Sequence, residues 1–80
     1  MDRHDVLSLI CIAFHTNHNK PQLTEEEFTT HIQEFCDDLL FSTCHDMFFD
    51  VPEKYVVRNE GHISLTEEGK SFVFNFIMRG

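Results

Sequence analysis

The fold of this chain is decided by residues 61–70, which read GHISLTEEGK. The alternation over residues 62–65 predicts a β-strand whose last side chain, a leucine, enters the core. Thr66 can cap a helix that starts at once, and the two glutamates after it would put negative charge at the positive end of the helix dipole. Because Gly69 has no side chain, this helix could pack closely against a neighbouring part of the fold. We therefore expect a strand that leads directly into a capped helix.

The residues before this stretch predict a second strand, paired with the first in a β-hairpin. Residues 55–58, YVVR, have high β-propensity. The turn at residues 59–61 ends in Gly61, which can adopt a positive φ. Because successive side chains of a strand point to opposite faces, Tyr55 and Val57 should share one face of the first strand, and Ile63 and Leu65 one face of the second.

The chain after Thr66 predicts a final helix with two apolar stripes. Helical spacing gives a core stripe of Phe72, Val73, Phe76 and Ile77, and a second stripe of Phe74 and Met78. A strand is the competing interpretation, because apolar residues also alternate over residues 72–78. The cap and the glutamates favour the helix.

The strongest helix signal lies in the N-terminal half, over residues 25–40. Thr24 and Glu27 have the spacing of a capping box, in which each side chain bonds the other residue's backbone N–H. Apolar side chains then recur at i, i+4, i+7 and i+11: Phe28, Ile32, Phe35 and Leu39.

Two further helices are expected on either side of it. The first would end before Pro21 and bury a stripe at i, i+3 and i+7, namely Leu7, Ile10 and Phe14. A short third helix would begin near residue 42, capped by Ser42 or Thr43, and carry Met47, Phe48 and Phe49.

This order of helix, helix, short helix, hairpin and helix resembles that of winged helix-turn-helix domains, which often enter the last helix through a Leu-Thr-x-x-Gly turn. The resemblance implies an α+β fold: a three-helix core, a C-terminal β-hairpin wing and a final helix. It also implies a third helix in the DNA major groove, usually with Arg, Lys, Asn or Gln facing the bases. Here residues 42–50 contain two Asp and no Lys or Arg, and the wing tip offers only Arg58 beside Glu60.

The composition indicates a single domain over residues 1–80, with 41% hydrophobic residues, too many for a disordered chain. The net charge of −8 and the scattered Lys and Arg make nucleic acid an unlikely partner and argue against anionic membranes. Three cysteines without a CxxC pair favour the cytoplasm. The apolar run at residues 6–14 is too short for a membrane span, and we expect no signal peptide.

Reactive residue types are present without a motif that joins them. His15 and His18 could share a metal ion, with Cys44 and His45 as further ligands. The alternative is that both histidines are polar residues at a helix end. A cysteine–histidine nucleophile pair is conceivable from Cys36 or Cys44, but no oxyanion motif accompanies it. We expect no catalytic residue, no cofactor and no metal.

These observations favour a small, acidic, non-enzymatic module that binds a protein partner or self-associates as a homodimer, as a phage or mobile-element regulator or inhibitor would. Acidic and exposed apolar side chains, with one Arg, would carry the contact: Glu34, Asp37, Asp38, Asp46, Phe48, Phe49, Arg58, Phe74 and Met78. For Phe48, a place in the core is favoured over a contact role. A DNA-binding transcriptional regulator, with the third helix and Arg58 on DNA, is the alternative function.

Overall fold

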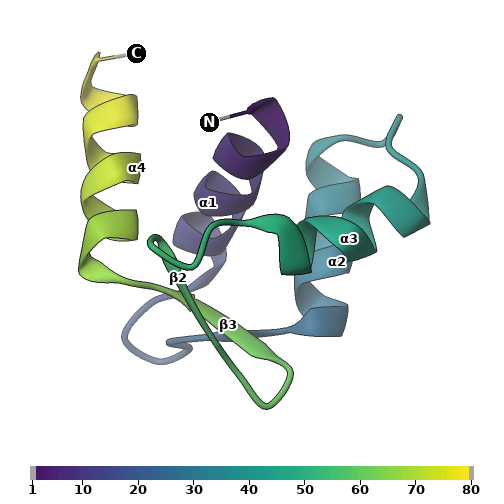
Figure 1. The fold of residues 1–80 in the computed structure, drawn as a ribbon, viewed down its shortest axis with the longest axis horizontal. Coiled ribbons are helices and arrows are strands. Elements are labelled where there is room, and N and C mark those ends of the chain that lie inside the picture. The colour runs from purple at the N-terminus through teal and green to yellow at the C-terminus, as the bar shows by residue number, and fades with distance from the viewer. Residues whose placement is uncertain (1, 80) are drawn as a thin grey trace.

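The computed structural model describes residues 2–79, which form four helices and a three-stranded antiparallel sheet (Figure 1). The elements follow in the order α1 (Arg3–His15), β1 (Leu23–Thr24), α2 (Glu25–Phe35), α3 (Phe41–Asp50), β2 (Val56–Asn59), β3 (His62–Leu65) and α4 (Glu67–Arg79). The predicted α+β class is confirmed, with three helices before the hairpin and one after it. Residues 72–78 are helical, so the strand interpretation is wrong.

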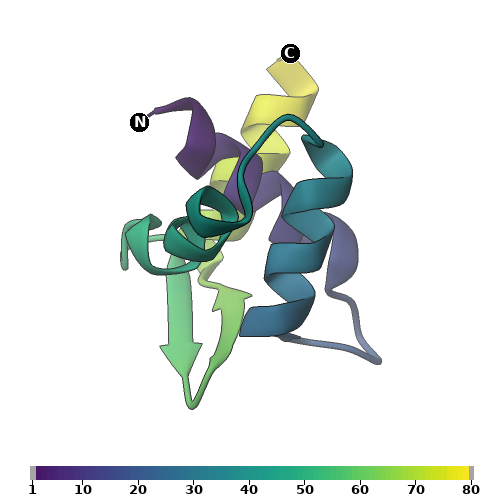
Figure 2. The same ribbon diagram turned by 90° about the vertical axis from the view of Figure 1, so that its right-hand side faces the viewer.

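Helix α1 lies at the centre of the molecule. It contacts the other three helices and β3, and Figure 1 shows α4 on one side of it and α2 and α3 on the other. In Figure 1 and Figure 2 alike, the start of α1 and the end of α4 lie opposite the hairpin turn. Among residues 2–79, no helix has both the length and the hydropathy that crossing a bilayer requires.

Strand β3 is the middle strand of the sheet, with β1 on one side and β2 on the other. Leu23 of β1 pairs with Ile63, and Val56 of β2 pairs with Leu65. Nothing in the sequence indicated that β1 joins the sheet. Because α2 follows β1 without a gap, this pairing holds the start of α2 against the hairpin, where the Glu25 N–H donates to the Gly61 carbonyl at 2.9 Å.

The capping box at the start of α2 is confirmed. The Thr24 hydroxyl accepts from the Glu27 N–H, and the Glu27 carboxylate accepts from the Thr24 N–H, both at 3.0 Å. The same carboxylate pairs with Lys20. The hydrogen bond from Lys20, followed by the bonds from Thr24, lowers the pKa of Glu27 to about 2. The N-terminus of α2 is therefore fixed by contacts within eight residues of chain.

The junction between β3 and α4 also forms as the sequence indicated. The Thr66 hydroxyl accepts from the Gly69 N–H at 3.0 Å and donates to the Lys54 carbonyl at 2.8 Å. A Cβ atom on Gly69 would overlap the carbonyl oxygen of Tyr55 and lie 3.1 Å from its carbonyl carbon. Only glycine therefore lets α4 approach the segment before β2 this closely.

One cluster of apolar side chains forms the core, and all the helices and strands contribute to it. Near its centre the rings of Phe28 and Phe48 meet edge to face, with centroids 5.6 Å apart. The buried hydrophobic residues are Leu9, Cys11, Ile12, Leu23, Phe28, Ile32, Cys44, Met47, Phe48, Val51, Val56, Ile63 and Val73.

The predicted core stripe of α1 is wrong in part, since Leu7 packs against the core and Ile10 is half-buried, but Phe14 is not covered. The buried positions are Ser8, Leu9, Cys11 and Ile12, whereas Phe14 is 73% exposed. Neighbours on several sides of α1, rather than a single sheet or helix, determine which of its side chains are covered. Ser8 tolerates burial because its hydroxyl donates to the His4 carbonyl at 2.8 Å.

Helix α2 ends at Phe35 instead of residue 40, and α3 starts at Phe41 without a side-chain cap from Ser42 or Thr43. Two consecutive aspartates follow the end of α2, and negative charge there opposes the helix dipole. The turn between the helices lets α3 pack back on α2, and it leaves Phe35 41% exposed.

The first strand of the hairpin is shifted by one residue from the predicted alternation, whereas the second strand turns Ile63 and Leu65 to the core as predicted. Val56 is buried and Val57 is 50% exposed, so the inward face of β2 starts at Val56. Tyr55 lies just before the strand, where its N–H donates to the Pro52 carbonyl and its carbonyl accepts from the Thr66 N–H, both at 3.0 Å. This anchorage starts the strand one residue later, and a shift of one residue exchanges the two faces.

Candidate functional site

The outer face of α3 carries a stripe of three aromatic rings, Phe41, His45 and Phe49, which we call the α3 stripe. These residues are spaced four apart, and adjacent ring centroids are 6.5 Å and 5.5 Å apart. Phe41 is 64% and Phe49 is 55% exposed. The sequence indicated Phe49 as a contact residue but missed Phe41, because the expected helix start at residue 42 placed Phe41 outside the helix.

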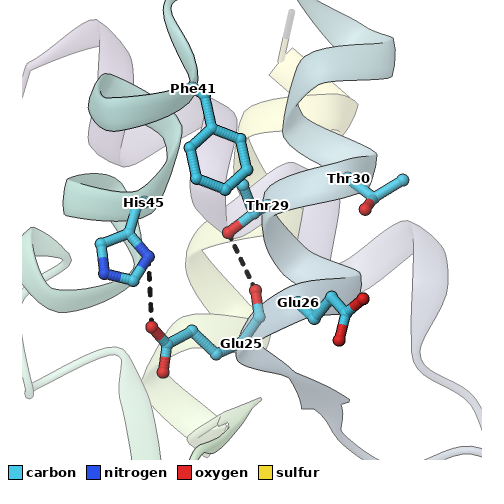
Figure 3. A pocket seen from close by; sticks show the side chains of 6 residues that line it. All are labelled: Glu25, Glu26, Thr29, Thr30, Phe41 and His45. Carbon is cyan, nitrogen blue, oxygen red and sulfur yellow. Dashed lines mark hydrogen bonds and ion pairs between the residues drawn. The ribbon is translucent and has the colours of Figure 1, made fainter.

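A groove opens beside this stripe, between α3 and the first turns of α2. Its volume is about 490 Å³, and Figure 3 shows Phe41 and His45 of α3 facing Glu25 and Thr29 of α2. We call it the α2–α3 groove; its lining residues are Glu25, Glu26, Thr29, Thr30, Phe41 and His45.

The polar groups of this groove are mostly acceptors. His45 Nδ1 lies 3.1 Å from a carboxylate oxygen of Glu25. The Thr29 hydroxyl donates to the Glu25 backbone carbonyl at 2.9 Å, so its donor is already used. An aromatic wall beside the carboxylates of Glu25 and Glu26 suits a cationic side chain, which is attracted both by carboxylates and by the face of a ring.

Arg58, the only cation of the hairpin strands and turn, is bound within the molecule. Its Nε donates to the Phe48 carbonyl at 2.7 Å, and a terminal guanidinium nitrogen donates to the Val51 carbonyl. Both carbonyls lie at the C-terminal end of α3, where a positive charge complements the helix dipole. Arg58 therefore connects the hairpin to α3, and the interaction role expected for it stays a prediction.

Replacing Arg58 by Ala should lower the free energy of unfolding by about 2–3 kcal/mol, since two hydrogen bonds from a charged donor are lost. Urea unfolding followed by circular dichroism would measure this change. Arg58→Lys keeps the charge without the two-pronged donor, and we expect it to recover less than half of the loss. If Arg58→Ala were as stable as the unchanged chain, Arg58 would not stabilise the contact between the hairpin and α3.

The remaining predicted contact residues do not form one site. Phe48 is 2% exposed and belongs to the core, because it follows Cys44 and Met47 on the inward side of α3; its proposed contact role is wrong. The acidic residues are exposed but separated, with Asp46 on α3 and the others at the end of α2 and in the loop after it: Glu34, Asp37 and Asp38.

Phe74 and Met78 lie together on the outside of α4, at 63% and 70% exposure. Phe76 and Ile77, which the sequence placed in the core, are 47% and 62% exposed. The stripe expected for the core is therefore wrong in its second half, because α4 buries only Gly69 and Val73.

The cysteines and histidines do not come together as a reactive or metal-binding group within the part of the chain that the structure describes. Burial, followed by the charge of Glu34, raises the pKa of Cys11 to about 12, and burial also raises the pKa of Cys44. Buried thiols of this kind contain little thiolate and react slowly. The ring of His15 stacks on that of His31 with centroids 3.6 Å apart. Over residues 2–79, no three His, Cys, Asp or Glu side chains are grouped as metal ligands.

The stacked histidines predict a loss of stability in mild acid. Burial, and then the charge of His31, lower the pKa of His15 from its ordinary 6.5, while Glu34 acts in the opposite direction. The unfolded chain therefore binds the proton more tightly, and this contribution to stability, complete above pH 6.5, is lost as the pH falls below that value. Urea midpoints from about pH 7 to about pH 5 should fall more steeply than in His15→Gln. Parallel pH profiles for the two proteins would be inconsistent with this assignment.

Comparison with protein-family models, with curated proteins and with solved structures found no significant match to this chain.

Proposed function

We propose that this chain is a non-enzymatic protein-interaction module on a winged-helix-like scaffold. Its binding surface is the α3 stripe with the α2–α3 groove, and its partner presents a basic segment with aromatic or aliphatic neighbours. The observation that carries the proposal is the composition of α3: its exposed side offers two phenylalanines, a histidine and two aspartates, with no Lys or Arg over Phe41–Asp50.

The order of the elements supports the scaffold. Three helices precede a β-hairpin, β1 pairs with the inner hairpin strand, and α4 follows through a Thr66 cap and Gly69. In winged-helix proteins that bind DNA, the helix at the place of α3 lies in the major groove. The same exposed helix can instead meet a protein, where aromatic side chains at the centre of a contact supply most of the affinity.

The DNA-binding alternative rests on this same topology, and the side chains do not favour it. DNA binding draws most of its affinity from Lys and Arg on phosphates. The hairpin's Arg58 is bound to carbonyls at the end of α3, and the whole chain has a net charge of −8. A basic and apolar peptide fits this surface better, because its cation can meet Glu25 and Glu26 while its apolar side chains cover the α3 stripe.

Selection of peptides from a displayed random library, with the protein immobilised at physiological salt, would test the proposal. We expect enriched peptides to contain Lys or Arg next to aromatic or aliphatic residues. Phe41→Ala should weaken their binding at least about tenfold, the effect expected for a central contact residue. Glu25→Gln should also weaken peptide binding, and the remaining affinity should depend less on salt concentration because one charge is lost from the surface.

The matched control is Phe14→Ala, which removes an equally exposed phenylalanine from α1, at 73% exposure. It should leave the affinity of the selected peptides unchanged. The proposal fails if the selected peptides bind Phe41→Ala as tightly as the unchanged protein. It also fails if a random-sequence DNA duplex binds at physiological salt and is released as salt rises, which would support the regulator instead.

A further inference from the structure

The second half of α4 is apolar over most of its circumference, and only the side of Asn75 and Arg79 is polar. Phe72 and Phe76 stack on one side with centroids 6.3 Å apart, Val73 faces the core, and further apolar side chains face outward. An apolar helix surface as broad as this one is normally buried. The exposed side chains are Phe74, Phe76, Ile77 and Met78.

Three of these side chains share one outward surface, which we call the α4 face. At 3.6 residues per turn, Phe74, Ile77 and Met78 fall within a sector of about 100°. Their exposures are 63%, 62% and 70%. The last turn of α4 stands clear of the other helices in both views (Figure 1, Figure 2), so a second molecule can reach this face.

The charge on α4 distinguishes this face from the rest of the molecule. The segment Lys70–Arg79 has two cations and no carboxylate, whereas the chain as a whole has fourteen acidic residues. Two copies can therefore bring this segment together without burying a carboxylate, and burying an unpaired charge is strongly unfavourable. Helix α1 has a stretch of the same length without acid, residues 6–15, but α1 packs on three helices and β3, whereas α4 leaves most of its apolar side chains exposed.

We propose that the occupant of the α4 face is a second copy of this chain, in an antiparallel α4–α4 homodimer centred on Phe74. At roughly 200 Å² per large side chain, the three residues expose on the order of 400 Å² of apolar surface per copy. A typical interface buries about 800 Å² per partner, and homodimer interfaces are about 65% apolar. The α4 face thus supplies most of the apolar surface that a stable dimer requires, and the neighbouring Lys70, Ser71 and Asn75 would form its polar rim.

The charges along α4 select the antiparallel orientation. Its first turn carries Glu67 and Glu68, and its last turn carries Arg79. In a parallel pair the four glutamates would meet at one end and the two arginines at the other. In an antiparallel pair each Arg79 approaches the acidic first turn of the other copy. Such a contact is isologous and closes after two subunits, so no fibre results.

Analytical ultracentrifugation over a wide range of protein concentration would test the dimer. We expect a reversible equilibrium between 9.5 kDa and twice that mass. Phe74→Glu and Met78→Glu should each weaken self-association by about a hundredfold or more, because a charge would be buried in the contact. Both residues are exposed in one copy, so circular dichroism should show unchanged folding. Phe14→Glu, which alters an exposed phenylalanine outside α4, should leave the equilibrium as it was.

Cysteine cross-linking tests the orientation. With Cys36 replaced by Ser, Phe74→Cys should form a disulfide between copies under mild oxidation. Met78→Cys should not, because an antiparallel pair centred on Phe74 holds the two Met78 positions about 12 Å apart along the helix axis. A mass of 9.5 kDa at every concentration, or a dimer unaffected by Phe74→Glu, overturns the proposal. Cross-linking of Met78→Cys but not Phe74→Cys overturns the antiparallel geometry. Either result leaves peptide binding at α3 untouched.

Discussion

Replacing Phe28 by Ala is expected to lower the free energy of unfolding by about 3–5 kcal/mol, the largest effect of any single truncation in this chain. Phe28 is fully buried, and its ring meets that of Phe48 edge to face at 5.6 Å. Truncation would remove both the buried apolar surface and this contact, and it would leave a cavity where α2, α3 and the sheet converge. A domain of this size has a total stability of roughly 4–12 kcal/mol.

Urea denaturation at neutral pH, followed by far-ultraviolet circular dichroism, would measure this loss. Phe14→Ala provides the control, because Phe14 is 73% exposed; its truncation should change stability by less than about 0.5 kcal/mol. A loss at Phe28 no larger than at Phe14 would mean that the core is not centred on this pair of rings.

Replacing Gly69 by Ala is expected to lower the free energy of unfolding by about 3 kcal/mol, although alanine is ordinarily the better residue within a helix. The added methyl group would overlap the backbone carbonyl oxygen of Tyr55 and lie 3.2 Å from Cδ2 of Leu65. A backbone oxygen cannot move aside as a flexible side chain can. The Tyr55 carbonyl also accepts from the Thr66 N–H, so relief of the overlap would disturb the junction between β3 and α4.

Gly61→Ala is the matched control for this substitution. Gly61 has a φ of +77°, and a Cβ there would meet no atom within 4 Å. Its replacement by Ala should therefore cost only the backbone strain of the left-handed region, about 1–2 kcal/mol. Thermal unfolding of both variants would compare them, and a Gly69→Ala protein that is as stable as the unchanged chain would refute the close approach of α4.

The features that the sequence predicted well depend on residues close together in the chain. The Thr24–Glu27 capping box, the Thr66 cap and the turn at Gly61 each involve a few neighbouring side chains and backbone groups. They can be predicted from the local sequence without knowledge of the tertiary fold. The α+β class followed because those signals set the order of the elements.

The features that were predicted wrongly depend on distant parts of the chain. The buried face of α1 is set by neighbours on several of its sides, so Phe14 is exposed and Ser8 is buried. The hairpin register depends on the anchorage of Tyr55 by Thr66, eleven residues later. The core stripe of α4 fails beyond Val73 because its main neighbours, α1 and β3, leave Phe76 and Ile77 exposed.

The candidate binding surfaces also contain parts that local sequence predicts and parts that depend on tertiary packing. Phe49, Phe74 and Met78 were identified as exposed apolar residues from helical spacing alone, and the structure places them at the surface. The α2–α3 groove was not foreseen, because it needs α3 to pack beside the start of α2. Arg58 was expected at a contact surface, but its carbonyl partners lie seven and ten residues earlier in the chain.

The central claim is that α3 presents a surface for a protein and not for DNA. Its most direct test is a nuclear magnetic resonance titration of ¹⁵N-labelled protein, first with a selected basic and aromatic peptide and then with a random-sequence DNA duplex, both at physiological salt. We expect the peptide to shift the backbone amides of residues 25–30 and 41–49 to saturation, and the duplex to leave them unchanged. Saturable shifts of α3 and the hairpin with the duplex, or peptide shifts confined to other elements, would contradict the account.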